Sequence, residues 1–183
     1  MRSVQILAGA VVLAALTISS APASAQAGAD PTIASVKAIY ESVKGYITKS
    51  AAQVPEDKYK YQPNKDVRTM GQLFGHIANA SAMFCNTAGG MNAGGPAGDA
   101  EKMTTKADLQ KALAAGFAAC DHAFGMVTAK NANETVDLFG TKHSRIGALA
   151  FNNAHLFEHY GNLVTYMRIN GMVPPSSAGG GGN

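Results

Sequence analysis

The chain has 183 residues, with 15 lysines and arginines against 12 aspartates and glutamates, and a formal net charge of +3. Because the charges nearly balance and the lysines are scattered, the sequence excludes the basic stripe of a nucleic-acid-binding surface. Beyond the N-terminal segment no stretch is long and apolar enough to span a bilayer, so we expect one domain without a stable membrane span.

Residues 1–25 have the features of a secretory signal peptide. Arg2 supplies the positive charge, residues 4–18 form an apolar run, and Ala23-Ser24-Ala25 matches a small-x-small cleavage pattern. We therefore expect an exported bacterial protein, periplasmic or secreted, whose mature chain begins near Gln26. The alternative is an uncleaved anchor helix, which the shortness of the apolar run disfavours, since a span needs ~20 residues.

Four segments carry apolar residues at the three- and four-residue spacing of amphipathic helices. Each begins near a residue that can cap it, most clearly at Asp30, which precedes a proline, and at Thr69 and Ser144. Prolines and glycine clusters interrupt the chain between these segments. The predicted helices are residues 31–52, 69–87, 105–128 and 144–170.

Four helices without a strong strand predict an all-α fold, a four-helix bundle over residues 26–176. Residues 129–143 form a loop in this prediction, with a short extended piece at 135–139. The glycine-rich residues 177–183 predict a flexible tail.

The two cysteines, Cys85 and Cys120, are an even number in a chain that looks exported, which favours a disulfide. Cys85 ends the second predicted helix and Cys120 lies on the apolar face of the third, so antiparallel neighbours could bring them together. Two buried free thiols are the alternative.

Three of the five histidines lie on predicted helix faces that can turn inward. His155 and His159 are one turn apart on the fourth helix, so both rings point the same way. His159 falls in the apolar row of that helix, and His76 lies beside the apolar row of the second. Polar groups in such rows destabilise a fold unless they are paired. Three neutral imidazoles with an open fourth position are a common way to hold a reactive divalent metal.

The alternative is that these histidines are ordinary core residues with Asn152 or Asn79 as partners. His122 and His143 are expected on the polar side of the third helix and at the start of the fourth, outside the site. Glu158 is a weak catalytic candidate, since its position next to His159 favours a solvent-facing side chain. The sequence contains no Cys-x-x-Cys-His, Glu-x-x-His, His-Glu-x-x-His, Walker A or Gly-x-Ser-x-Gly pattern.

A resemblance to the DinB-like superfamily of metal-dependent enzymes is carried by VPEDKYKYQPNKDVRTMGQLFGHIANASAMFC and FNNAHLFEHYGNLVTYMRINGMVPPSS, most specifically by GQLFGHIAN and HLFEHYGNLV. It extends from about Thr32 to Ser176. The resemblance implies an up-down-down-up bundle and a three-histidine site for a divalent metal, often zinc or nickel. The family's ligand positions match His76, His155 and His159.

We identify the chain as resembling an exported subgroup of this family, for which hydrolysis of an unknown small-molecule substrate is the leading hypothesis. Glu158, or a loop residue such as Tyr61, would assist. Characterised relatives include thiol-dependent transferases and isomerases, which makes thiol transfer the runner-up. A non-catalytic envelope protein that binds a metal or small ligand is the third alternative, and the family also suggests a homodimer.

Overall fold

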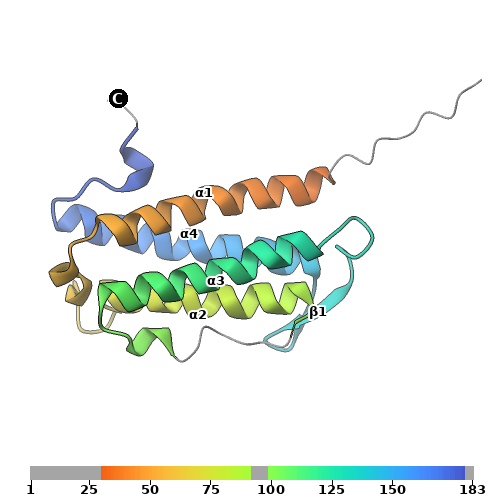
Figure 1. Ribbon diagram of the computed structural model, residues 1–183, viewed down its shortest axis with the longest axis horizontal. Helices are drawn as coiled ribbons and strands as arrows, with labels where there is room; N and C mark the ends of the chain where they lie inside the picture. The colour runs from red at the N-terminus through yellow and green to blue at the C-terminus, as the bar shows by residue number, and fades with distance from the viewer. Residues whose placement is uncertain (1–29, 92–98, 180–183) are drawn as a thin grey trace, which may run out of the picture.

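The computed structural model describes residues 30–91 and 99–179. The predicted signal peptide and most of the predicted tail lie outside these residues. The described chain forms a bundle of four long helices (Figure 1), which confirms the predicted fold class. The observed helix ends lie within two residues of the predicted ones. The helices are α1 (Pro31–Gln53), α2 (Met70–Gly89), α3 (Lys106–Met126) and α4 (Arg145–Ile169).

The helix starts lie where the capping residues placed them. The Asp30 carboxylate accepts hydrogen bonds from the first turn of α1, and the Ser144 hydroxyl accepts one from Gly147. Thr69 and Gln72 form a reciprocal capping box at α2. Such caps satisfy backbone donors that a helix start otherwise leaves unpaired, and each stabilises a helix by about 1 kcal/mol.

The helix directions are up, down, down, up, as the family resemblance implies (Figure 1). The neighbours α2 and α3 are therefore parallel, and the expectation of an antiparallel pair is wrong. The two helices are parallel because a short 3-10 helix, η2 (Ala100–Lys102), lies between them in the chain and packs beside Gly75 near the start of α2. The chain thus returns to the beginning of α2 before α3 starts.

Gly75 permits this return. A Cβ atom on Gly75 would lie 2.3 Å from the carbonyl oxygen of Ala100, so only glycine lets η2 contact the helix at this point. Gly116 has the same role between α3 and α2, where a Cβ would lie 2.6 Å from the Ala78 carbonyl oxygen.

A small antiparallel hairpin precedes α4, formed by β1 (Thr135–Leu138) and β2 (Thr141–Ser144). The predicted extended piece at 135–139 corresponds to β1, whereas β2 was expected to be loop. Phe139 and Gly140 form the connecting turn with φ angles of 55° and 78°, the left-handed conformation that two-residue hairpin turns require. A strand this short and polar carries too little periodicity to be recognised.

The core contains the rows that the sequence predicted. Leu149, Leu156 and Leu163 of α4 are fully buried, and His159 lies in the same row at 7% exposure. Cys85 and Cys120 form a buried disulfide, with their Cα atoms 4.7 Å apart. None of the helices in the described ranges combines the length and apolar character that crossing a bilayer needs.

Candidate metal centre

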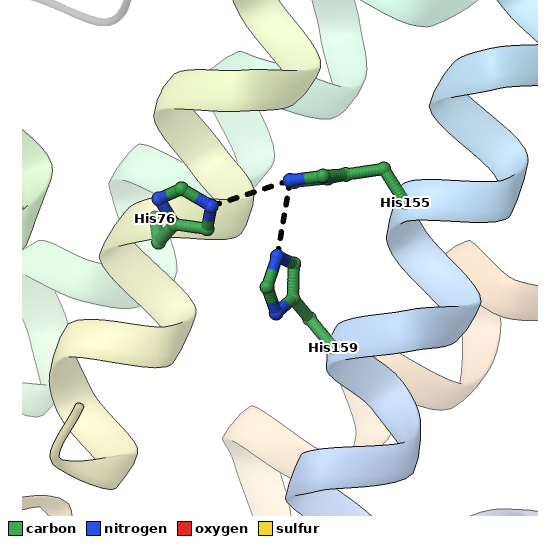
Figure 2. Close-up of side chains that lie close together, drawn as sticks. All are labelled: His76, His155 and His159. Carbon is green, nitrogen blue, oxygen red and sulfur yellow. Dashed lines mark hydrogen bonds between the residues drawn. The ribbon is translucent and has the colours of Figure 1, made fainter. Parts of the chain in front are cut away.

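The structure brings together the three histidines singled out from the sequence. His76 comes from α2, and His155 and His159 come from α4 (Figure 2). These two helices are neighbours in the bundle and run antiparallel (Figure 1). The His155 Nε2 atom is 3.2 Å from the Nε2 of His76 and 3.0 Å from that of His159. All three nitrogens lie within 4.8 Å of one another.

This spacing fits a shared metal ion. Nitrogen ligands at about 2.0–2.1 Å from a tetrahedral zinc ion stand about 3.4 Å apart, close to the two distances observed. The Nδ1 atom of His155 is buried and has no hydrogen-bond partner among the described residues. The His155 Nε2 atom faces two other imidazole nitrogens, and a cation bound there would give all three nitrogens a common partner.

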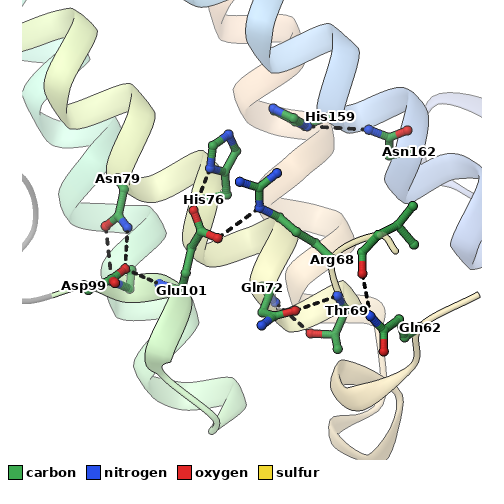
Figure 3. Close-up of polar contacts among 12 residues, drawn as sticks. Gln62, Arg68, Thr69, Gln72, His76, Asn79, Asp99, Glu101, His159 and Asn162 are labelled. Carbon is green, nitrogen blue, oxygen red and sulfur yellow. Dashed lines mark hydrogen bonds and ion pairs between the residues drawn. The ribbon is translucent and has the colours of Figure 1, made fainter. Parts of the chain in front are cut away.

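Glu101 holds the outer side of His76 (Figure 3). Its Oε1 atom accepts a hydrogen bond from His76 Nδ1 at 2.7 Å, and its Oε2 atom accepts one from Arg68 Nε at 2.9 Å. A proton held at Nδ1 leaves the lone pair at Nε2, which faces the other two histidines. Carboxylates commonly orient metal-binding histidines in this way.

Neither Glu101 nor Arg68 was identified from the sequence. Glu101 lies 25 residues after His76 and belongs to η2, so no helical spacing connects the two positions. Arg68 ends the connection before α2, where the sequence has no periodic pattern. The Asn162 amide, which lies 3.5 Å from His159 Nδ1, was also missed, although it follows His159 by one helical turn.

The other candidates are placed elsewhere or at the edge of the site. Asn152 contacts the disulfide sulfur of Cys120, and Asn79 bonds Asp99 and Ala100, so neither partners the histidines. Tyr61 packs edge-on against Tyr166. His122 is exposed on α3, as expected.

Glu158 is exposed and lines a pocket of about 670 Å³ beside His159. Its predicted catalytic role stays a prediction, but Glu158 and His159 line the same pocket. His143 is part of β2 and packs its ring against Phe151.

The protein groups around the three histidines favour neutral imidazoles. Burial of the His155 ring lowers its pKa from the ordinary 6.5 to about 4, and nearby His159, His76 and Arg68 add to the shift. Burial and His76 also lower the pKa of His159. Neutral imidazole is the form that binds metal.

The pKa of Glu101 also departs from its ordinary value. Partial burial by itself raises this pKa, but hydrogen bonds from Arg68 and His76 outweigh burial, so the pKa lies below its ordinary value. Glu101 is therefore an anion at neutral pH and can hold the proton of His76 at Nδ1.

The depressed pKa of His155 predicts an acid-sensitive metal-free protein. The unfolded chain takes up a proton at His155 near pH 6.5 and the folded chain near pH 4. Because the unfolded state binds more protons between these values, stability should fall as the pH is lowered from 6.5 to 4. Urea unfolding in the presence of a chelator measures this, and His155→Gln should flatten the decline. Equal wild-type stability at pH 7 and pH 5 would contradict the expectation.

The contact between Glu101 and His76 predicts a role for Glu101 in metal affinity. Glu101→Gln removes the charge that holds Nδ1–H, so we expect a metal affinity about 10- to 100-fold weaker, measured by competition with a chelating dye. Glu158→Gln is the matched control, because Glu158 lines the same pocket without a described hydrogen bond to an imidazole. Equal losses in the two variants would argue against an orienting role for Glu101.

Comparison with known proteins agrees with this architecture. A DinB-like protein from Bacillus cereus has a crystal structure that matches with a TM-score of 0.68 and 17% identity, covering 78% of this chain and 95% of that one. A DinB-like protein from Bacillus subtilis matches with a TM-score of 0.59 and 20% identity, covering 76% and 93%. Identities this low support the fold alone. No curated protein matches the chain.

A family model also matches most of the helical bundle. The model of the DinB superfamily matches residues 39–163. This range contains all three clustered histidines and both disulfide cysteines, and runs from α1 to near the end of α4. The chain therefore belongs to the DinB superfamily.

Proposed function

We propose that this protein is an exported, metal-dependent hydrolase that acts on a small molecule. His76, His155 and His159 would hold the metal through their Nε2 atoms. The observation that carries the proposal is the convergence of these three nitrogens, from two helices, within 4.8 Å. Imidazole ligands suit zinc, nickel, copper and iron, and the family resemblance favours zinc or nickel.

A zinc ion with three imidazole ligands and an open position lowers the pKa of its bound water to near 7 and polarises carbonyl groups. The chain's own residues supply orientation and proton handling. Glu101 keeps a proton on His76 Nδ1, and Arg68 holds Glu101 in place. Both contacts fix the ring of His76 before a ligand arrives, which is the preorganisation that catalysis needs.

Glu158 is the proposed general base. It lines the pocket beside His159 and makes no ion pair with any residue of the described ranges, so its carboxylate is available to accept a proton from a water in that pocket. The other pocket carboxylate close to the histidines, Glu101, already accepts from His76 and Arg68. This division favours Glu158 over Glu101 for proton transfer.

The proposal of export is supported by the predicted signal peptide and by the buried Cys85–Cys120 disulfide, because disulfides persist in oxidising compartments. Intracellular thiol cofactors are scarce there. Export therefore favours hydrolysis over thiol transfer.

An activity screen on the mature chain tests the proposal. Esters, amides and thiol–electrophile pairs are offered to zinc-loaded, nickel-loaded and chelator-treated protein. We expect ester or amide hydrolysis that needs the metal and disappears in His76→Ala. Turnover confined to the thiol–electrophile pairs would favour a transferase. One bound metal ion per chain without any turnover would favour a binding protein. Either of these two results would contradict the proposed hydrolase activity.

A further inference from the structure

The pocket beside the histidines is polar and carries charged groups of both signs. Its volume is about 670 Å³, and it extends from His159 to the connection that precedes α2. The polar residues that line it include Arg68, Gln72, Glu101, Glu158 and Asn162. A small organic molecule fits in this volume, and the nature of its charged residues indicates what kind of molecule it would be.

The cations of the pocket differ in what surrounds them. Lys65 is highly exposed, with a side chain 90% accessible, and pairs with its neighbour Asp66 at 3.7 Å. Arg68 is less exposed, at 41%, and is fixed by Glu101 at 2.9 Å. Its backbone is fixed too, because the Tyr166 hydroxyl donates to the Arg68 carbonyl oxygen at 3.0 Å. Arg68 is thus the cation that the fold holds in one position.

Only one edge of the Arg68 guanidinium is used by the protein. The Nε atom donates to Glu101, whereas the two terminal nitrogens have no hydrogen-bond partner among the described residues. Figure 3 shows these nitrogens directed away from Glu101, toward the space between the rings of His76 and His159. The positive charge of Arg68 is close enough to contribute to the lowered pKa values of His155 and His159.

We propose that Arg68 is the anion-binding residue of this pocket, which takes a substrate bearing a carboxylate or phosphate group close to its reacting bond. The inference deepens the proposed function, on which it rests, by naming the chemical class of the substrate. The two terminal nitrogens of a planar guanidinium match the two oxygens of such a group. An anion placed between Arg68 and a metal ion would also relieve the repulsion between these two positive centres.

Anion binding by the mature chain tests this inference. Benzoate and inorganic phosphate are the probes, titrated by calorimetry into zinc-loaded and metal-free wild type, Arg68→Gln, Arg68→Lys and Lys65→Gln. Zinc content is measured on the same samples. We expect the wild type to bind at least one probe and Arg68→Gln to bind it about 10- to 100-fold more weakly. The probe affinity of Arg68→Lys should be intermediate, because lysine keeps the charge but lacks the paired terminal nitrogens of the guanidinium.

Lys65→Gln is the matched control, since it removes one positive charge from the same pocket. We expect it to change the affinity less than about twofold, because an exposed charge is screened by solvent. The two probes separate a preference for carboxylate from one for phosphate. A wild type that binds neither probe, or equal losses in Arg68→Gln and Lys65→Gln, would overturn the inference.

The same measurements separate this inference from the proposed function. If Arg68→Gln binds zinc fully and binds the probes as tightly as the wild type, then the metal alone holds the anion and the role of Arg68 is refuted, with the metal site intact. If no variant or wild type binds zinc but probe affinity still depends on Arg68, the proposed function fails and the anion site stands. If Arg68→Gln loses only zinc affinity, Arg68 acts solely by holding Glu101, which also refutes the inference.

Discussion

His155→Ala is expected to abolish the metal binding that we propose for the three histidines. His155 is the central member of the site, since its Nε2 lies 3.2 Å from that of His76 and 3.0 Å from that of His159. Its loss leaves one imidazole on each of two helices and removes one of the three proposed ligands. Because the loss of an outer hydrogen-bond partner alone weakens metal binding about 10- to 100-fold, removal of a ligand should exceed a hundredfold.

Elemental analysis after dialysis against a weak chelator measures this result. The wild type should retain about one divalent ion per chain and His155→Ala a negligible amount. His122→Ala is the control, because His122 is exposed on α3 and does not belong to the cluster of three histidines. The metal should also raise the melting temperature of the wild type and of His122→Ala, since binding to the folded state alone stabilises it. Full metal content in His155→Ala would remove the basis of the proposed function.

Loss of the disulfide is expected to produce the largest change in stability. The Cys85–Cys120 bond closes a loop of 35 residues, for which the chain-entropy model gives about 3–4 kcal/mol of stabilisation. The double variant Cys85→Ala/Cys120→Ala should lose about this much free energy of unfolding. Denaturation in urea, with and without a reductant, measures it.

The reductant provides the internal control for the disulfide prediction. The reductant should lower the free energy of unfolding of the wild type to near that of the double variant. It should leave the double variant unchanged, since that variant has no cysteine left to reduce. A further effect on the metal site is expected to be small, although Phe84, next to Cys85, packs its ring against His155 at 5.2 Å. If reduction did not change the urea midpoint of wild-type unfolding, the disulfide would not contribute to stability in solution.

The sequence was most informative where one residue or one helix carries the signal. The caps at Asp30, Thr69 and Ser144 act on backbone groups two or three positions away, so the helix starts could be predicted from neighbours alone. The His155–His159 pair shares a helix face for the same local reason. The apolar row that contains His159 correctly predicted a buried imidazole.

Helix direction shows the limit of local reasoning. An antiparallel pair of α2 and α3 was the natural expectation from consecutive helices, and it is wrong. What decides the direction is the close contact of η2 with Gly75, whose missing side chain leaves room for the Ala100 carbonyl. The spacing of apolar residues carries no information about such a contact, because it joins positions 25 residues apart.

By itself, then, the sequence determined the four helices, their caps, and which histidines and cysteines face inward, because each of these follows from interactions within one or two helical turns. The tertiary structure decided that three imidazoles from two helices converge and that Glu101 orients His76. It also decided that Arg68, held by Glu101 through Nε, has two terminal nitrogens without a partner among the residues that the structure describes. These contacts join side chains from α2, η2, α4 and a connecting segment. Only the packing of the bundle, and the return of the chain to the start of α2, sets their distances.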